Sequence, residues 1–392
     1  MVSNTDGVAR IDAAGAALAA PADAPVVTAS PREWDRFAGW PKTSARNVLF
    51  ALFLMMLLAA IVPITNGKST VSTQSFAENL TSPNEKERPR DDDLALYDRA
   101  IERIQGGENY YDFIVEEQRK SDYPVTPGLA VRLPTLAYID AALGVPGQTA
   151  AAILLMLAVL VAWWRRLGEE PCPQNKRRLI LAFLFLGASL GVNRYYFTLH
   201  ELWAGMLLAL SFGLHRPGEW GAALAVAALA LFIRELALPF VALMGAMALW
   251  RRDWKEFAAW TALGLVFIAV LAIHLSIIAE QVLPSDRHGP SWLALRGLGG
   301  WLSNIVLSSN LRFLPHWLAG PAVILAMLGW IGWRSDAGLF GTFLYAGYGL
   351  SFTIVGRGDN FYWGAMIAPA MFIGFAFVPM ALRSLIAAAT AK

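Results

Sequence analysis

Cysteine is almost absent from this chain of 392 residues, which contains only Cys172. A single cysteine excludes an intrachain disulfide, and no Cys and His residues occur at the spacing of a zinc site. Charge is also scarce, since Asp, Glu, Lys and Arg make up 16% of the residues, against about 25% in soluble domains. The net charge of +2 gives no reason to expect a nucleic acid as a partner.

Hydrophobic residues are abundant instead, at 56% of the chain, with a mean hydropathy of +0.46. The 15 Trp and 21 Phe suit a protein whose aromatic rings lie at the two membrane interfaces. This composition predicts an all-α polytopic membrane protein with about ten transmembrane helices. The ten apolar runs are Val48–Ile64, Ala150–Trp164, Leu179–Val192, Leu199–Leu214, Trp220–Ile233, Leu236–Trp250, Phe257–Ile278, Leu318–Trp333, Gly338–Val355 and Trp363–Leu382.

Basic residues set the expected orientation. Residues 1–46 carry five Arg and Lys before the first apolar run, and the loops 165–178 and 251–255 are also basic. Because cytoplasmic loops are enriched in Lys and Arg, we expect a multi-pass inner (plasma) membrane protein with both termini cytoplasmic. On this reading 1–45 is a flexible cytoplasmic tail, and 386–392 is a cytoplasmic C-terminus.

The outer first loop, residues 66–147, is the longest polar segment between apolar runs. Its end is ambiguous, because residues 134–143 are too short to span a bilayer comfortably, and they are interpreted as a re-entrant or interfacial helix. Within the loop, residues 94–105 have the pattern of an amphipathic juxtamembrane helix, with apolar residues at intervals of three and four. Gly106-Gly107 is expected to end that helix.

Three aspartates, Asp91, Asp92 and Asp93, precede this helix. They fit helix capping and favourable interaction with the helix dipole. Three adjacent carboxylates also repel one another, which favours one of the three as a general base. Both interpretations stay open at this stage.

Other polar residues lie at helix ends on the same expected outer side. Arg234 and Glu235 either pair with each other or bind a phosphate through the arginine. His200 and Glu201 either begin a helix or contact a substrate. The remaining members of this candidate site are Tyr110, Tyr111, Arg194, Arg357, Asn360 and Tyr362.

Several short motifs of the first loop and the late part of the chain form a pattern. They are Asp93 with Tyr97, Ala100-Ile101, Gly106-Gly107, the tyrosine pair Tyr110-Tyr111, the segment Val131–Tyr138, and the late segment Arg357–Pro369. This pattern resembles that of the GT-C glycosyltransferases, the polyprenyl-phosphate-sugar-dependent enzymes that include aminoarabinose transferases and protein O-mannosyltransferases. The chain departs from the family in having Asp93-Leu94 where Asp-Glu is common.

The resemblance implies a GT-C-like transmembrane domain over residues 46–385. It would transfer a sugar from a polyprenyl-phosphate donor to a lipid or glycan acceptor on the outer (periplasmic) side. Asp93, with Asp92 as its rival, would be the catalytic base. Arg234, Arg357 and Arg194 would bind the donor phosphate, and a divalent cation remains open as a cofactor.

A transporter or flippase of lipid-linked sugars is the main alternative, because the same outer cavity and arginines would serve it. The sequence has no internal repeat and no pair of Gly- or Pro-broken helices in matching positions, which many transporters have. A structural membrane subunit is the third interpretation, and it leaves the acidic loop without a role.

Overall fold

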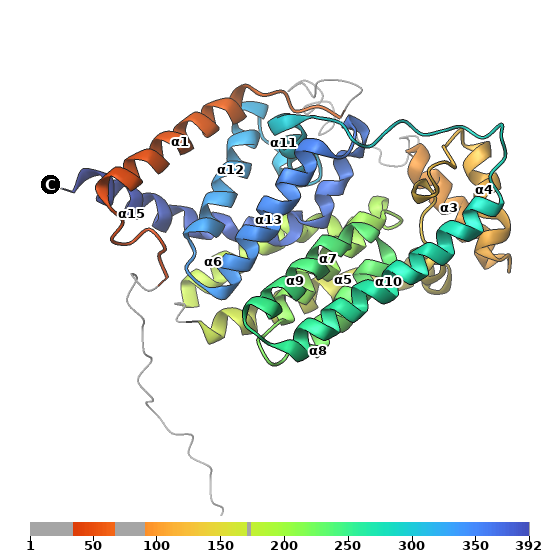
Figure 1. Ribbon diagram of the computed structural model, residues 1–392, viewed down its shortest axis with the longest axis horizontal. Helices are drawn as coiled ribbons and strands as arrows, with labels where there is room; N and C mark the ends of the chain where they lie inside the picture. Colours follow the sequence, from red (N-terminus) through yellow and green to blue (C-terminus); the bar gives the residue numbers. More distant parts are fainter. Residues whose placement is uncertain (1–33, 67–90, 171–173, 392) are drawn as a thin grey trace, which may run out of the picture.

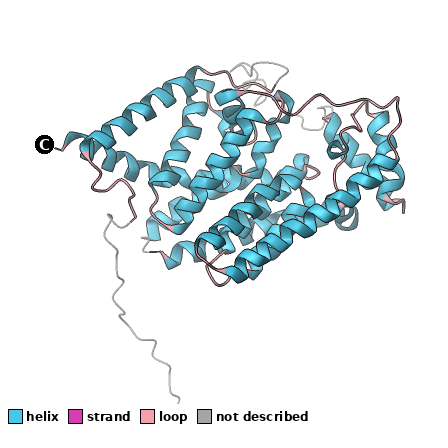
Figure 2. Ribbon diagram, viewed as in Figure 1, coloured by secondary structure: helices cyan, strands magenta, loops and turns pink. Residues whose placement is uncertain are grey.

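The computed structural model describes residues 34–66, 91–170 and 174–391. In these ranges the chain folds into helices, and its β-structure is limited to isolated bridges (Figure 2). The predicted all-α class is therefore confirmed for the described part of the chain.

Four described helical segments are long and apolar enough to cross a membrane: Lys42–Ile61, Gly128–Glu169, Trp254–Glu280 and Ala368–Thr390. Several of them expose large apolar side chains, such as Phe50 at 64% and Leu265 at 62%. Contiguous apolar surface of this kind is rare on a soluble monomer, so the chain has the features of a helical membrane protein. Shorter apolar helices cover 200–214, 221–233, 235–250, 297–307 and 316–332.

The helices form two neighbouring groups (Figure 1). In one group, α1 (Lys42–Ile61) packs on α12 (His316–Gly332) and α15 (Val378–Thr390), while α13 (Asp336–Ile354) packs on α11 (Gly297–Leu307) and α12. In the other, α7 (His200–Leu214) packs on α5 (Thr135–Glu169) and α8 (Gly221–Ile233), and α9 (Leu238–Trp250) packs on α10 (Trp254–Glu280). The first-loop helices α3 (Asp92–Gln105) and α4 (Tyr110–Lys120) lie at one end of α10 (Figure 1).

Shorter elements connect these helices. They are η3 (Gly128–Ala130), α6 (Gln174–Ala188), η4 (Ser189–Val192), η5 (Arg194–Tyr196), η6 (Glu235–Ala237), η7 (Asn310–Phe313), η8 (Gly358–Met366), α14 (Ala368–Met371) and η9 (Phe372–Phe377).

An aromatic cluster joins the two groups and holds α7 in place. The Phe212 ring stacks on Trp330 at 5.8 Å and meets Trp163 edge-on at 4.9 Å. Phe212 also lies 4.6 Å from Phe340. Trp163 and Trp330 are fully buried, and aromatic pairs add about 0.5–1.5 kcal/mol each beyond the area that they bury. This cluster fixes the helix that carries His200 and Glu201 at its other end.

The helix predicted at 134–143 is present and is separate from the apolar helix that follows it. The range of α5 contains two helices joined at Gly144, whose φ of 58° and ψ of 176° are not helical. The re-entrant or interfacial position of the first helix stays a prediction. Residues 67–90 of the outer first loop lie outside the described residues.

The stretch between the predicted helices 257–278 and 318–333 contains the buried helix α11. The glycine-rich start of α11, followed by Ser303 and Asn304, gives no long apolar run in the sequence. The last apolar run is also not one helix, because short 3₁₀ segments, η8 and η9, flank α14. Pro369 and the glycines of this stretch explain the breaks, since both residue types disfavour a continuous helix.

Both ends of the described chain pack in one core cluster. Trp34 and Phe37 are buried, and Phe37 packs in a core cluster with Leu385. At the other end, α15 extends to Thr390, with Ala389 buried in the same cluster. The described part of 1–45 is therefore packed, and most of 386–392 continues a helix.

Helices α12 and η9 cross at glycines, and this crossing generates a stability prediction. A methyl group on Gly329 would overlap the carbonyl oxygen of Gly374. Overpacking typically costs about 1–3 kcal/mol, so Gly329→Ala should lower the midpoint of thermal unfolding in detergent. Gly347→Ala on α13 is the control, because a methyl group there meets no atom within 4 Å. Equal midpoints for the two variants would contradict the close crossing.

Candidate functional site

The first-loop helices place the acidic residues. Helix α3 begins at Asp92, with Asp91 as an N-cap that makes no side-chain capping hydrogen bond. Its buried residues Leu94, Leu96 and Ala100 dock it on α5 and α4. Helix α4 has Asn109 as its N-cap, and the Asn109 side chain accepts a hydrogen bond from the Tyr111 backbone N–H at 3.0 Å. The aspartates thus lie in the first turn without acting as side-chain caps.

Asp93 and Asp92 differ in their surroundings. Asp93 is half-buried and accepts a hydrogen bond from the Tyr123 hydroxyl, whereas Asp92 is exposed. Burial and the hydrogen bond to the Asp93 carboxylate raise the pKa of Tyr123. Tyr123 therefore stays protonated and can act as a donor that orients the carboxylate. Of the two candidate bases, Asp93 is the one that faces the protein.

Two arginines and two glutamates form a buried ion cluster, defined here as Arg132, Glu201, Arg234 and Glu235. Arg234 Nε donates to Glu201 Oε1 at 2.6 Å, and Arg234 Nη1 donates to Glu235. Arg132 Nη2 lies 3.9 Å from the same Glu201 oxygen. The side chains of Arg234 and Glu201 are only 1% and 2% exposed. The charges balance by count, as buried ions require.

Tyr97 connects the ion cluster to the helix of Asp93. Its hydroxyl accepts a hydrogen bond from Arg132 Nε at 3.2 Å, and its ring packs edge-on against His200 at 4.8 Å. Burial raises the pKa of Tyr97, with Arg132 opposing and both Glu201 and Asp93 adding to the rise. Asp93 and Tyr97 are four residues apart in α3, so they share one face of the helix.

Two further tyrosines support the ion cluster. The Tyr110 hydroxyl donates to the Arg132 carbonyl oxygen at 2.8 Å. Burial raises the pKa of Tyr362, with Arg132 opposing and Glu201, Tyr97 and Asp93 adding to the rise. Asn360 Nδ2 donates to the Tyr362 hydroxyl at 3.4 Å. The predicted pocket residues Tyr110, Tyr362 and Asn360 therefore lie in or beside this cluster.

Other predicted site residues have different surroundings. The Arg357 guanidinium binds Asp359 and the Pro290 carbonyl oxygen near the surface. Tyr111 turns toward α10, where its hydroxyl lies 3.1 Å from His274 Nδ1. Arg194 is exposed on η5, next to Tyr195, whose hydroxyl accepts from the Asp91 backbone N–H at 3.3 Å. These residues are thus not members of the buried ion cluster.

Arg132 and Tyr123 are site residues that the sequence does not single out. In the sequence, Arg132 belongs to the family-like segment Val131–Tyr138 and has no predicted role of its own. A lone arginine among apolar residues before a helix is nevertheless a signal, because ionisable groups at membrane depth are expensive and usually functional. Tyr123 carries no such signal, since its contact with Asp93 depends on how α3 and α4 fold back on each other.

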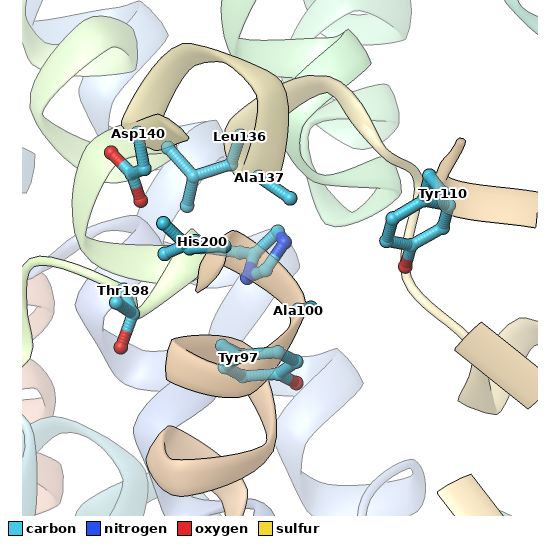
Figure 3. Close-up of a pocket in the computed structure, with 9 residues that line it drawn as sticks. Tyr97, Ala100, Tyr110, Leu136, Ala137, Asp140, Thr198 and His200 are labelled. Carbon is cyan, nitrogen blue, oxygen red and sulfur yellow. The ribbon is translucent and has the colours of Figure 1, made fainter. Parts of the chain in front are cut away.

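A small cavity lies between α3, the first part of α5 and the start of α7 (Figure 3). Its volume of about 10 Å³ is near the space that one water molecule needs. The lining residues are Tyr97, Ala100, Ile101, Tyr110, Leu136, Ala137, Asp140, Thr198 and His200. Among the described residues, no group of three or more His, Cys, Asp or Glu side chains is arranged to hold a metal ion.

Comparisons with family models, curated proteins and solved structures find no match for this chain. The chemical interpretation of the site therefore rests on the contacts of its side chains. A half-buried carboxylate, Asp93, shares a helix face with a tyrosine that binds Arg132. This arrangement can take a proton at one point and offset developing negative charge at another.

The burial of Arg234 generates a second stability prediction. Removing one member of a buried ion pair typically costs about 3–5 kcal/mol. Arg234→Met should therefore lower the thermal midpoint strongly, because it leaves Glu201 buried without its closest cation. Arg357→Met is the matched control, because the Arg357 and Asp359 side chains are 27% and 46% exposed and such pairs contribute about 0–1 kcal/mol. Comparable losses in the two variants would show that Arg234 is not the central cation.

Proposed function

We propose that this protein is a membrane glycosyltransferase of the GT-C type, which transfers a sugar from a polyprenyl-phosphate donor to a lipid or glycan acceptor. One observation carries the proposal: Asp93 lies one helical turn from Tyr97, and Tyr97 accepts a hydrogen bond from Arg132 in the buried ion cluster. A candidate general base and a candidate phosphate-binding cation are thereby brought to the same site. The family resemblance of the first loop agrees with this assignment.

In the proposed reaction the acceptor hydroxyl loses its proton to the Asp93 carboxylate. The acceptor oxygen attacks the anomeric carbon of the donor sugar from the face opposite the phosphate. The bond between that carbon and the phosphate oxygen breaks, and polyprenyl phosphate leaves with the bonding electrons. Tyr123, which donates a hydrogen bond to Asp93, keeps the carboxylate oriented toward the acceptor.

Arg132 is the best candidate to bind the leaving phosphate. Arg234 already donates to two carboxylates, Glu201 and Glu235. Within the described part of the chain, the Arg132 guanidinium has a long ion pair of 3.9 Å to Glu201 and a hydrogen bond to a neutral tyrosine. Its guanidinium can therefore accept an additional anion at lower cost, and a planar fork matches phosphate oxygens well. Arg234 would then act by holding Glu201 in place.

The orientation of the chain belongs to the same proposal. About ten crossings with both termini cytoplasmic would put α3, α4 and the ion cluster on the outer face of the inner membrane. The basic loop 165–178 would face the cytoplasm. Single cysteines placed in this loop of a Cys172→Ser protein should react with an impermeant thiol reagent only after the membrane is opened. Reaction in intact cells would contradict this orientation.

The transporter alternative needs a polar path through the protein, and α7 offers none along its length. One end of α7 carries Glu201 in the ion cluster. Beyond its other end, His215 Nε2 lies 2.7 Å from Glu256 Oε1 in a second buried polar group. The intervening residues 202–210 are apolar, and nearly all are buried. This separation favours chemistry at one end over passage from one side to the other.

The substitution Asp93→Asn tests the proposal. Asparagine keeps the shape and can still accept the Tyr123 hydrogen bond, but it cannot take a proton. Loss of general-base catalysis should slow transfer by about 10²–10⁴-fold. The assay measures polyprenyl phosphate released from a panel of polyprenyl-phosphate sugars, and donor binding and thermal stability should stay near those of the wild type.

Asp92→Asn is the matched control, because Asp92 is exposed and one residue away. It should retain most of the activity. Loss of activity in Asp92→Asn alone would show that Asp92, and not Asp93, is the base. Full activity in both variants would remove the glycosyltransferase proposal and favour a transporter of lipid-linked sugars.

A further inference from the structure

Asp140 is a buried carboxylate on the lining of the small cavity, and its pairing with the protein is incomplete. It lies on the first part of α5, before the bend at Gly144, and is 1% exposed. Neither carboxylate oxygen makes a hydrogen bond within the described part of the chain, although the Gln148 amide interacts with the carboxylate across the bend. A buried polar group without a partner costs several kcal/mol in an apolar environment, so Asp140 requires an explanation.

His200 presents a second atom of the same kind. It is 3% exposed, and its Nδ1 makes no well-aligned hydrogen bond among the described protein groups, although the Thr198 backbone interacts with the ring. Both Asp140 and His200 line the small cavity of about 10 Å³ (Figure 3). Two elements, α5 and α7, thus each bring a buried acceptor to one small cavity.

We propose that this cavity binds a single structural water molecule that bridges Asp140 and His200, and that Asp140 is a positioning residue for the site. The volume suits one water, and a buried water needs two to four polar partners. The water would donate one hydrogen bond to an Asp140 oxygen and the other to His200 Nδ1. His200 is then neutral, with its ring proton on Nε2.

The bridge would act on the ion cluster through two contacts. The His200 ring packs against Tyr97 at 4.8 Å, and Tyr97 accepts the hydrogen bond from Arg132. A His200 ring fixed by the water therefore limits where Tyr97 and the Arg132 guanidinium can lie. The catalytic consequence rests on the proposed function, but the water itself does not.

The experiment compares Asp140→Leu with Asp140→Asn by ¹⁵N NMR of histidine-labelled protein. The chain has five histidines, and His200→Gln identifies the His200 signals. In the wild type, Nδ1 should have the shift of an unprotonated, hydrogen-bonded ring nitrogen. Asp140→Leu should move the Nδ1 chemical shift to that of a ring nitrogen without a hydrogen bond. Asp140→Asn, whose side chain still accepts a hydrogen bond, should leave the Nδ1 shift unchanged. Asp112→Asn, at an exposed acid on α4, is the control for loss of charge.

The kinetic measurement uses the transfer assay. Asp140→Leu should lower kcat by up to about a hundredfold with little change in KM for the donor. Asp140→Asn should retain most of the wild-type kcat. An unchanged Nδ1 shift in Asp140→Leu, or the same shift change in both variants, would overturn the proposal.

Two further outcomes are informative on their own. If the wild type transfers no sugar, the nitrogen shifts still decide whether the water is bound, so failure of the proposed function is recognised separately. If Asp140→Leu does not fold, an experimental structure of the wild type at a resolution that shows ordered water decides. Density for one water between Asp140 and His200 is expected, and its absence would overturn the proposal.

Discussion

The pairing of buried charges in the ion cluster is the constraint on which the rest of the site depends. Arg132 precedes α5, Glu201 begins α7, and Arg234 and Glu235 follow α8. None of these charges could be buried alone, because an uncompensated ion in a low-dielectric interior costs several kcal/mol. The ends of three helices must therefore meet at one place, and the first-loop helices pack against that place.

Small residues allow the close helix packing around this cluster. Gly205 of α7 lies against the backbone of η8 at Ala365, and Gly364 of η8 lies against Asn304 of α11. In a membrane, where apolar side chains gain little by leaving lipid, close backbone approach is a main source of helix association. The same contacts bring Tyr362 to the ion cluster, which explains why an irregular 3₁₀ segment occurs there.

The sequence predicts the regular parts of this fold well, because long apolar runs such as 257–278 are set by local composition. It predicts poorly where tertiary contacts override local pattern. The glycine-rich start of α11, for example, does not look helical. In the site, Glu201 and Arg234 stand out in the sequence as charged residues at the ends of apolar runs, whereas only the family resemblance distinguishes Asp93 from Asp92. Tyr123, Asp140 and the role of Arg132 depend on chain folding over tens of residues, which spacing alone does not encode.

Binding of the donor phosphate by Arg132 is the central step of the proposed function. The affinity of the purified protein for a polyprenyl phosphate tests this binding directly. Arg132→Lys keeps the charge but loses the planar fork. We expect it to bind about tenfold or more weakly, a loss of about 1.4 kcal/mol or more, while Arg357→Lys binds like the wild type. Equal affinities of the wild type and Arg132→Lys would contradict the account.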